Sequence, residues 1–232
     1  MAVSSDIYAS EELRWPSEIS NLEQKQEIAD RAAARACAGQ LIGIGSGSGA
    51  YLVLLAIGRR ATREGLPISV LTSSFETETA ARRLDLPVVP LGSAEPDWGV
   101  DGADEVDPAR RLLKGRGGAL FREKILWSTA KRMYLAVDAS KHVDRLGAGF
   151  PLPVEVHPLA VQLGIRALRD AGATDCEIRL ATGKDGPVFS ENGNLIVDAT
   201  FNEIPFGLHA VLKAVPGVIE TGLFEGYAFE LL

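Results

Sequence analysis

The sequence predicts an α/β fold, in which a doubly wound (Rossmann-like), mostly parallel sheet carries a second, smaller α+β domain. Two observations lead to this prediction. Through residues 22–138, short apolar runs alternate with helical segments, which is typical of a parallel sheet covered by helices on both faces. From about residue 147 this alternation stops, and the strand and helix segments that follow fit a small α+β unit.

The elements of the first domain follow in order along the chain. Residues 1–20 are polar and aperiodic, and we expect them to be loosely held. Ser20-Asn21-Leu22-Glu23 resembles a capping box and predicts a helix that ends near Gly39. Further helices are expected over 50–65, 77–86 and 120–132, and strands over 41–45, 68–74, 87–91, 98–107 and 134–138.

The second domain is assigned to residues 147–224, so the first domain comprises 1–146 together with the C-terminal residues 225–232. The last residues are expected to return to the first sheet as an edge, although the chain ends soon afterwards. Within the second domain, helices are expected over 157–172 and 204–217, and strands over 176–181, 194–201 and 218–224.

The composition limits the classes of partner. The chain has 232 residues, a net charge of −7 and no block of Lys and Arg, so it is not expected to bind nucleic acid. No apolar stretch approaches the roughly 20 residues of a membrane span, and the N-terminus lacks a signal-peptide pattern. Cys37 and Cys176 have no CxxC spacing and suit a reducing compartment. The expected location is the cytoplasm.

A glycine-rich stretch, Gly43 to Ala50, follows the first predicted strand and opens the next helix. It matches the loose dinucleotide pattern GxGxxG/A, but the second strand ends in Thr72-Ser73-Ser74, without the acid that holds a ribose. The lysine of a nucleotide-binding P-loop is also missing, because Ala50 follows Gly49. Free backbone N–H groups and two hydroxyls at a helix N-terminus remain, and they predict a phosphate monoester site over Ser46–Gly49.

Two aspartates lie at the carboxyl end of the strand that is predicted to begin at residue 98. Asp101 and Asp104 flank Gly102-Ala103 at the carboxyl end of that strand, the edge where open α/β sheets bind ligands. Two carboxylates there could bind sugar hydroxyls, transfer protons or hold a divalent metal. The small residues between them leave room for a ligand.

A second charged stretch runs from Lys114 through a glycine loop to Glu123 and Lys124. It suggests an anion-binding group beside an acid or base, although Glu123 and Lys124 could equally form a surface pair. Lys141 follows another strand end at the same predicted edge, where a solvated lysine is the alternative.

Taken together, these segments resemble the A type of ribose-5-phosphate isomerase. The resemblance covers residues 21–224 and rests on seven stretches in the same order: GIGSGSGA, DGADEVD, LLKGRGGALFREKI, VDASKHVDRLG, PLPVEVHP, NGNLIVD and PGVIETGLF.

The resemblance implies interconversion of ribose 5-phosphate and ribulose 5-phosphate in the pentose phosphate pathway, with no metal and no organic cofactor, by a homodimer or homotetramer. It also implies roles for individual residues. Glu123 is the implied acid/base, with Asp101, Asp104 and Lys114 as its catalytic partners, while Lys25 and Ser46–Gly49 bind phosphate. The full set of expected substrate-binding residues is Lys25, Ser46, Gly47, Ser48, Gly49, Asp101, Gly102, Ala103, Asp104, Lys114, Gly115, Arg116, Gly117 and Lys141.

The chain departs from the family pattern at two positions. The family loop commonly reads GTGST, so a threonine hydroxyl is missing at Gly49, where the backbone N–H remains. The family's KGGGG is here Lys114-Gly115-Arg116-Gly117-Gly118, and Arg116 either faces solvent or adds a cation to the site.

Three other functions are weighed against this one. A sugar-phosphate sensor would normally carry a basic helix-turn-helix, and residues 1–20 are too short and acidic for one. An amino-sugar phosphate deaminase or transferase would share the architecture but differ in its reaction. A dinucleotide oxidoreductase is the weakest alternative, because the ribose-binding acid is missing.

Overall fold

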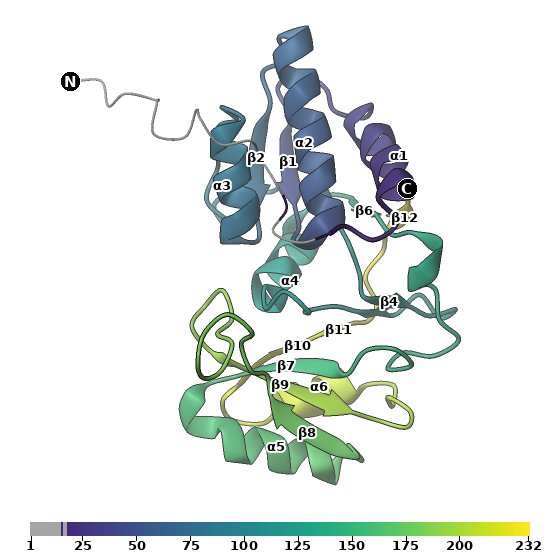
Figure 1. The fold of residues 1–232 in the computed structure, drawn as a ribbon, viewed down its shortest axis with the longest axis vertical. Coiled ribbons are helices and arrows are strands. Elements are labelled where there is room, and N and C mark those ends of the chain that lie inside the picture. Colours follow the sequence, from purple (N-terminus) through teal and green to yellow (C-terminus); the bar gives the residue numbers. More distant parts are fainter. Residues whose placement is uncertain (1–14, 16–17) are drawn as a thin grey trace, which may run out of the picture.

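The computed structural model describes Trp15 and residues 18–232, which form two stacked parts in Figure 1. The expectation of a loosely held N-terminus concerns mainly residues 1–14, 16 and 17, which lie outside the described residues. Trp15 is not loose, because its ring packs against Tyr51 with ring centroids 5.1 Å apart.

The first part contains a five-stranded sheet in which every pair of neighbours is parallel, as predicted. Its strand order is β12-β6-β3-β1-β2. The short C-terminus does return to this sheet, because β12 pairs with β6. The strands are β1 (Leu41–Ile44), β2 (Ser69–Thr72), β3 (Trp98–Asp101), β6 (Met133–Leu135) and β12 (Glu230–Leu231).

Helices cover both faces of this sheet, so it is doubly wound. Because successive strand residues face opposite sides, Ile42 and Ile44 pack into one apolar cluster with the first three helices. Leu71 and Leu135 point the other way and pack with Leu126 of the fourth helix. The helices are α1 (Leu22–Ala33), α2 (Gly47–Glu64) and α3 (Phe75–Arg83) on the first face, and α4 (Leu120–Thr129) on the second.

The second part is an antiparallel sheet of order β10-β7-β9-β8 with two helices packed on it, which agrees with the predicted α+β unit (Figure 1). A separate core of aliphatic residues, including Val154, Val197 and Leu212, joins the helices to the sheet. Its elements are β7 (Leu152–Val156), α5 (Val161–Asp170), β8 (Asp175–Ile178), β9 (Leu195–Thr200), α6 (Leu208–Lys213) and β10 (Val218–Thr221).

A small third sheet lies between the two parts (Figure 1). Its strands are β4 (Glu105–Val106), β5 (Leu112–Leu113) and β11 (Leu223–Phe224), in the order β11-β5-β4. Two of them come from residues assigned to the first domain and one from the second. We propose to keep the division at 146/147 and 224/225, with this sheet as the shared junction.

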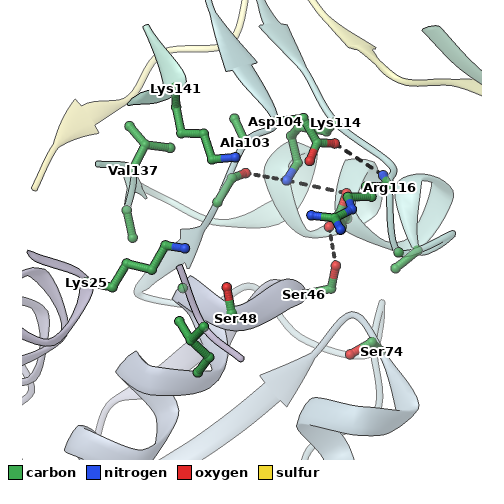
Figure 2. Close-up of a pocket in the computed structure, with 18 of the residues that line it drawn as sticks. Lys25, Ser46, Ser48, Ser74, Ala103, Asp104, Lys114, Arg116, Val137 and Lys141 are labelled. Carbon is green, nitrogen blue, oxygen red and sulfur yellow. Dashed lines mark hydrogen bonds and ion pairs between the residues drawn. The ribbon is translucent and has the colours of Figure 1, made fainter. Parts of the chain in front are cut away.

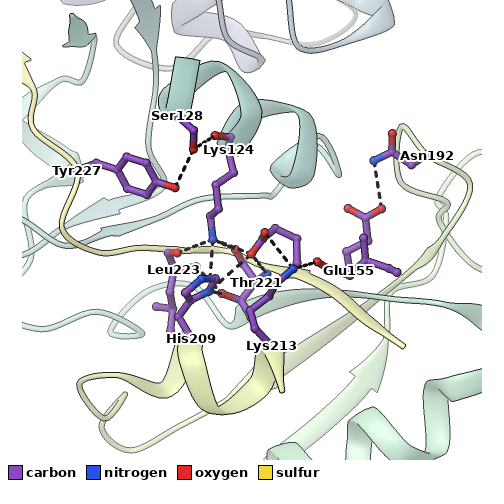
Figure 3. Close-up of polar contacts among 11 residues, drawn as sticks. Lys124, Ser128, Glu155, Asn192, His209, Lys213, Thr221, Leu223 and Tyr227 are labelled. Atoms are coloured by element: carbon purple, nitrogen blue, oxygen red, sulfur yellow. Dashed lines mark hydrogen bonds and ion pairs between the residues drawn. The ribbon is translucent and has the colours of Figure 1, made fainter. Parts of the chain in front are cut away.

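Buried charges also join the two parts, as Figure 3 shows. The Lys124 ammonium donates hydrogen bonds to Glu220 Oε1 (2.8 Å) and to the carbonyls of Thr221 (2.9 Å) and Leu223 (2.8 Å). Lys124 belongs to α4, whereas its three partners belong to β10 and β11 of the C-terminal half. The predicted alternative of a surface Glu123–Lys124 pair is therefore wrong, since both residues are buried.

Several predicted elements differ from the structure. Residues 87–91 form only an isolated bridge, Val88 to Val70, because Pro87 and Pro90 lack the N–H donors of a strand ladder. The capping box is absent, since α1 begins after Asn21, which has φ 52° and caps with no side-chain hydrogen bond. The fourth helix ends at Thr129 and not at 132. The strands β5 and β7 were not expected as such.

Candidate active site

A cleft of about 380 Å³ opens at the carboxyl end of the parallel sheet, above the C-termini of β1, β2 and β3. It is lined by nearly all of the residues that the sequence nominates (Figure 2). Two of them differ from the rest in position: Asp101 lies beneath the cleft, and Arg116 is exposed at its rim. The nominated residues that line the cleft are Lys25, Ser46, Gly47, Ser48, Gly49, Gly102, Ala103, Asp104, Lys114, Gly115, Arg116, Gly117, Glu123 and Lys141.

Asp101, the last residue of β3, is fully buried and its carboxylate is saturated with donors. It accepts hydrogen bonds from Trp127 Nε1 (2.9 Å), Gly102 N (2.8 Å) and Ser46 N (3.3 Å). Gly45 is required beside it, because a Cβ there would lie 2.1 Å from Asp101 Oδ1. Asp101 was expected to contact the sugar, but in this geometry it reaches the cleft only through its neighbours.

Lys114 contacts the Asp101 carboxylate and lines the cleft. Its Nζ is 2.9 Å from Asp101 Oδ2 and 3.4 Å from Glu123 Oε2, and it donates to the Gly102 carbonyl at 2.5 Å. The side chain is only 3% exposed. Burial alone lowers the pKa of Lys114, but the adjacent Asp101 and Glu123 carboxylates outweigh it, and the pKa is raised. The site therefore holds a fixed positive charge.

Glu123 lies in the first turn of α4, whose start directs the carboxylate into the cleft. Oε1 accepts a hydrogen bond from Ser46 Oγ (2.5 Å), and Oε2 faces the Lys114 ammonium. Burial, followed by repulsion from Asp101, raises the pKa of Glu123 to about 7. A carboxyl group with this pKa can both accept and return a proton near neutral pH.

Two cations, Lys25 and Lys141, lie at the end of the cleft away from Ser74, and the N-terminus of α2 also lines the cleft (Figure 2). Ser46 is the N-cap of α2 and makes no side-chain cap bond, so the first N–H groups of the helix remain available. In Figure 2 the Lys25 and Lys141 ammonium groups point into the space above Ser48. Burial, opposed by Asp138 but aided by Lys141 and Arg116, lowers the pKa of Lys25.

Asp104 and the loop that follows Lys114 line one side of the cleft. Arg116 N donates a hydrogen bond to Asp104 Oδ2 (3.2 Å), which brings the DGADE stretch and the glycine loop together. Burial raises the pKa of Asp104, although Lys114 opposes this shift. Gly115 (φ +107°) and Gly118 (φ +79°) adopt backbone conformations that a side chain would strain.

Arg116 lies at the cleft with an exposed side chain, where its positive charge adds to that of Lys25 and Lys141. Its charge acts to lower the pKa of both Lys25 and Asp104, although burial leaves the pKa of Asp104 raised.

The second departure from the family pattern is Gly49. A Cβ there would lie 3.3 Å from the Ala136 carbonyl, so a larger residue requires a small backbone shift.

Sequence reasoning missed several residues at the site. Asp138 joins the segments around Lys25, since its carboxylate accepts from Asn21 Nδ2 (3.0 Å) and Ser140 N (3.0 Å) and lies 3.8 Å from Lys25 Nζ. Its position after β6, at the same sheet edge, is a signal that could have found it. Glu191 lines the cleft from a turn of the small domain and had no such signal.

No group of three or more His, Cys, Asp or Glu side chains among the described residues is arranged to hold a metal ion.

Known proteins resemble this chain in sequence over most of its length. The family described as ribose 5-phosphate isomerase A (phosphoriboisomerase A) matches residues 69–232. The ribose-5-phosphate isomerase A of Thermosynechococcus vestitus is 41% identical over 214 residues, covering 90% of each chain. That of Methanothermobacter thermautotrophicus is 42% identical over 192 residues, covering 82% of this chain and 84% of the relative.

Solved structures extend the similarity to the whole fold. Ribose 5-phosphate isomerase A from Methanocaldococcus jannaschii superimposes with a TM-score of 0.87 and 37% identity, covering 92% of this chain and 95% of that one. A D-ribose-5-phosphate isomerase in complex with phospho-erythronic acid gives a TM-score of 0.86 and 36% identity, covering 90% and 93%. With a matching family pattern, relatives above 40% identity and a shared fold, the chain belongs to the ribose 5-phosphate isomerase A family.

Proposed function

We propose that Glu123 is the acid/base by which this chain interconverts D-ribose 5-phosphate and D-ribulose 5-phosphate. The reaction is the aldose–ketose isomerisation of its family. The observation that carries the proposal is the environment of Glu123. Its buried carboxylate has a pKa of about 7 and lies between the Ser46 hydroxyl and the Lys114 ammonium, in the wall of the cleft.

The phosphate is proposed to bind at the cationic end of the cleft. The N–H groups of Gly47, Ser48 and Gly49 at the start of α2 supply hydrogen bonds, and Lys25, Lys141 and Arg116 supply charge. The phosphate takes no part in bond breaking. By fixing one end of the sugar, it holds the reacting carbons near Glu123 and contributes to turnover as well as affinity.

The proton transfer follows from this placement. In the open-chain aldose, the Glu123 carboxylate removes the proton from C2, and the C2–H electron pair becomes the C1–C2 double bond of an enediolate. Negative charge develops on O1, where the Lys114 ammonium and N–H groups of the glycine loop stabilise it. Glu123 then returns the proton to C1, while a proton moves from O2 to O1, and the ketose results.

We assign the hydroxyl protons to Asp104, which lines the cleft and whose pKa is raised by burial. Asp101 acts through Lys114, because its enclosed carboxylate keeps that ammonium charged and in place. The reaction is redox-neutral overall, and Lys114 supplies the positive charge that the enediolate needs. We therefore propose that it proceeds with neither a metal nor an organic cofactor.

The setting of the enzyme is also proposed. We expect a homodimer or homotetramer in the cytoplasm that acts in the pentose phosphate pathway and binds a small sugar phosphate and no nucleic acid. Both cysteines, Cys37 and Cys176, are unpaired, which fits a reducing compartment. Within the described part of the chain, no helix has the length and apolarity needed to cross a membrane.

The proposal is tested by Glu123→Gln, which keeps the shape of the side chain and removes the base. We expect kcat to fall by about 10³-fold with KM for ribose 5-phosphate nearly unchanged, in a coupled assay of ribulose 5-phosphate formation. The matched control is Glu177→Gln, at an exposed position on β8, which should retain wild-type rates. Near-normal turnover in Glu123→Gln would remove Glu123 from the role of base.

A further inference from the structure

An arginine of the small domain reaches the glycine loop of the active site. Arg179 follows β8, and its Nη1 donates hydrogen bonds to the carbonyl oxygens of Gly115 (3.0 Å) and Arg116 (2.7 Å). The rest of the guanidinium is held by Asp198 of β9, which accepts from Nε at 2.7 Å and also from Nη2. The two side chains are about one-fifth exposed, so the pair is partly shielded from water.

These hydrogen bonds set the direction of two peptide groups. In a planar trans peptide the C=O and the following N–H point in opposite directions. Because the Gly115 carbonyl faces Arg179, the N–H of Arg116 faces away from Arg179, and it donates a hydrogen bond to Asp104 Oδ2. By the same geometry, the Arg116 carbonyl directs the N–H of Gly117 away from Arg179, on the cleft side of the loop.

The Gly117 N–H lies close to the reacting groups. Gly117 lines the cleft, and a Cβ on it would be 3.7 Å from Ser46 Oγ, the hydroxyl bonded to Glu123. Among the described residues, no acceptor takes a hydrogen bond from this N–H. The donor is therefore available to a ligand beside the base and the Lys114 ammonium.

The two peptides differ in what else holds them. The Gly115 carbonyl also accepts from Gly118 N (3.1 Å) and Arg116 N donates to Asp104, whereas among the described residues only Arg179 bonds the Arg116–Gly117 peptide. Residues 115, 117 and 118 are glycines, which allow the backbone several conformations. If either peptide rotated, a carbonyl oxygen would replace an N–H at the cleft wall and would face the developing negative charge.

We propose that Arg179, held by Asp198, is a positioning residue for the isomerisation. It orients the Gly115–Arg116 and Arg116–Gly117 peptides so that their N–H groups face the cleft, where the Gly117 N–H is a donor to the enediolate oxygen. Arg179 itself does not touch the sugar. This inference rests on the proposed function of the site and adds a contribution from the small domain.

The test compares Arg179→Met and Arg179→Lys with Arg166→Met, an exposed arginine of α5 in the same domain. For each variant, kcat and KM for ribose 5-phosphate are measured, together with the inhibition constant of phospho-erythronic acid. The carboxylate of that compound is planar and negatively charged, as the enediolate is, although its two oxygens share one carbon.

If Arg179 orients the donor, Arg179→Met lowers kcat by about 10- to 100-fold and raises the inhibition constant in proportion, while KM changes less than about twofold. Arg179→Lys should be intermediate, because an ammonium cannot bond both carbonyls and Asp198 in one plane. Arg166→Met should match the wild type.

Unchanged kcat in Arg179→Met would overturn the proposal. So would a variant that loses thermal stability while kcat does not fall in proportion to the rise in the inhibition constant. If Arg179→Met does not fold, the same comparison is decided by Arg179→Lys and Asp198→Asn. Failure of the proposed function gives a different result, since Glu123→Gln would then keep near-normal turnover, or the wild type itself would not isomerise ribose 5-phosphate.

Discussion

Burial changes the acid–base property of a single glutamate, Glu123. Glu123 is only 3% exposed and its nearest charges oppose one another, since Asp101 disfavours its ionised form and Lys114 favours it. Burial is the largest effect, and the resulting pKa of about 7 lies far above the 4.5 of a free glutamate. Both protonation states are thus populated at neutral pH, which proton removal and return require.

The rate should therefore depend on pH in a defined direction. The base must be ionised, so kcat/KM should rise with pH up to about 7 and level off above it. Ser46→Ala removes a hydrogen bond that lowers the pKa of Glu123, and should move this limb to higher pH. Because the substrate phosphate also titrates near pH 6, kcat is measured alongside kcat/KM. A limb near pH 4.5 in both would contradict the assignment.

At this scale, local motifs made the site predictable. The glycine loop, DGADE and the stretch from Lys114 to Glu123 each follow a strand end, so their convergence at one sheet edge could be expected. Burial could not be read from the motifs, and this is why the Glu123–Lys124 pair and the contact role of Asp101 were uncertain. Arg179 and Glu191 reach the site from a sequence-distant domain and carry no local signal.

At the scale of elements, helix α4 serves two parts of the molecule at once. Successive helical residues point about 100° apart, so Glu123 faces the cleft while Lys124 faces β10 and β11. Glu220 and the two strand carbonyls compensate the buried ammonium, and Phe224 lies beneath it at 4.7 Å from the ring centroid. Burial still lowers the pKa of Lys124 to about 8.

Removing this charge should destabilise the fold. Lys124→Met leaves Glu220 buried with only Lys213 and His209 nearby, and we expect the free energy of unfolding to fall by about 3 kcal/mol. Urea denaturation at pH 7 measures the loss. Adding Glu220→Gln should recover part of it, because no unpaired carboxylate then remains. A double variant less stable than Lys124→Met would show that Lys124 does not stabilise the fold through its ion pair with Glu220.

Sequence periodicity identified most elements but did not delimit the shortest ones. The two-residue strands β4 and β11 lie within longer expected strands, 98–107 and 218–224, and β5 was not expected, because two residues are too few to show an alternating pattern. The strand β7 lies in PLPVEVHP, where its two flanking prolines and Pro153 are unfavourable for a strand by propensity. Tertiary pairing with β9 and β10 overrides that preference.

At the scale of the whole molecule, the C-terminal residues support the active site from behind. Phe229 and Tyr227 pack edge-on against Trp127, with ring centroids 5.9 and 5.8 Å apart. Trp127 in turn donates its indole N–H to Asp101. Residues near position 229 thus help to fix a carboxylate at position 101, and this link exists only because the chain end returns to the first sheet.

Phe229→Ala should therefore weaken both the fold and the reaction. We expect the free energy of unfolding to fall by about 3 kcal/mol from the cavity beside Trp127, and kcat to fall modestly as Asp101 and Lys114 loosen. Chemical denaturation and steady-state kinetics measure the two effects. Phe229→Leu, which keeps most of the volume, should restore most of both. A stable Phe229→Ala enzyme would show that Phe229 is not supporting Trp127.

The three-stranded junction sheet has a consequence for how this enzyme can evolve. Asp104 precedes β4 and Lys114 follows β5, so both groups are joined directly to the strands that connect the two domains. Bending of the junction sheet itself would shift Lys114, at the end of β5, relative to Asp101 at the end of β3 and Glu123 of α4. Hinge motion, by which many two-domain proteins admit a ligand, would here disrupt the charge arrangement itself. Substitutions that loosen the domain interface should thus be removed by selection on rate, even where the protein still folds.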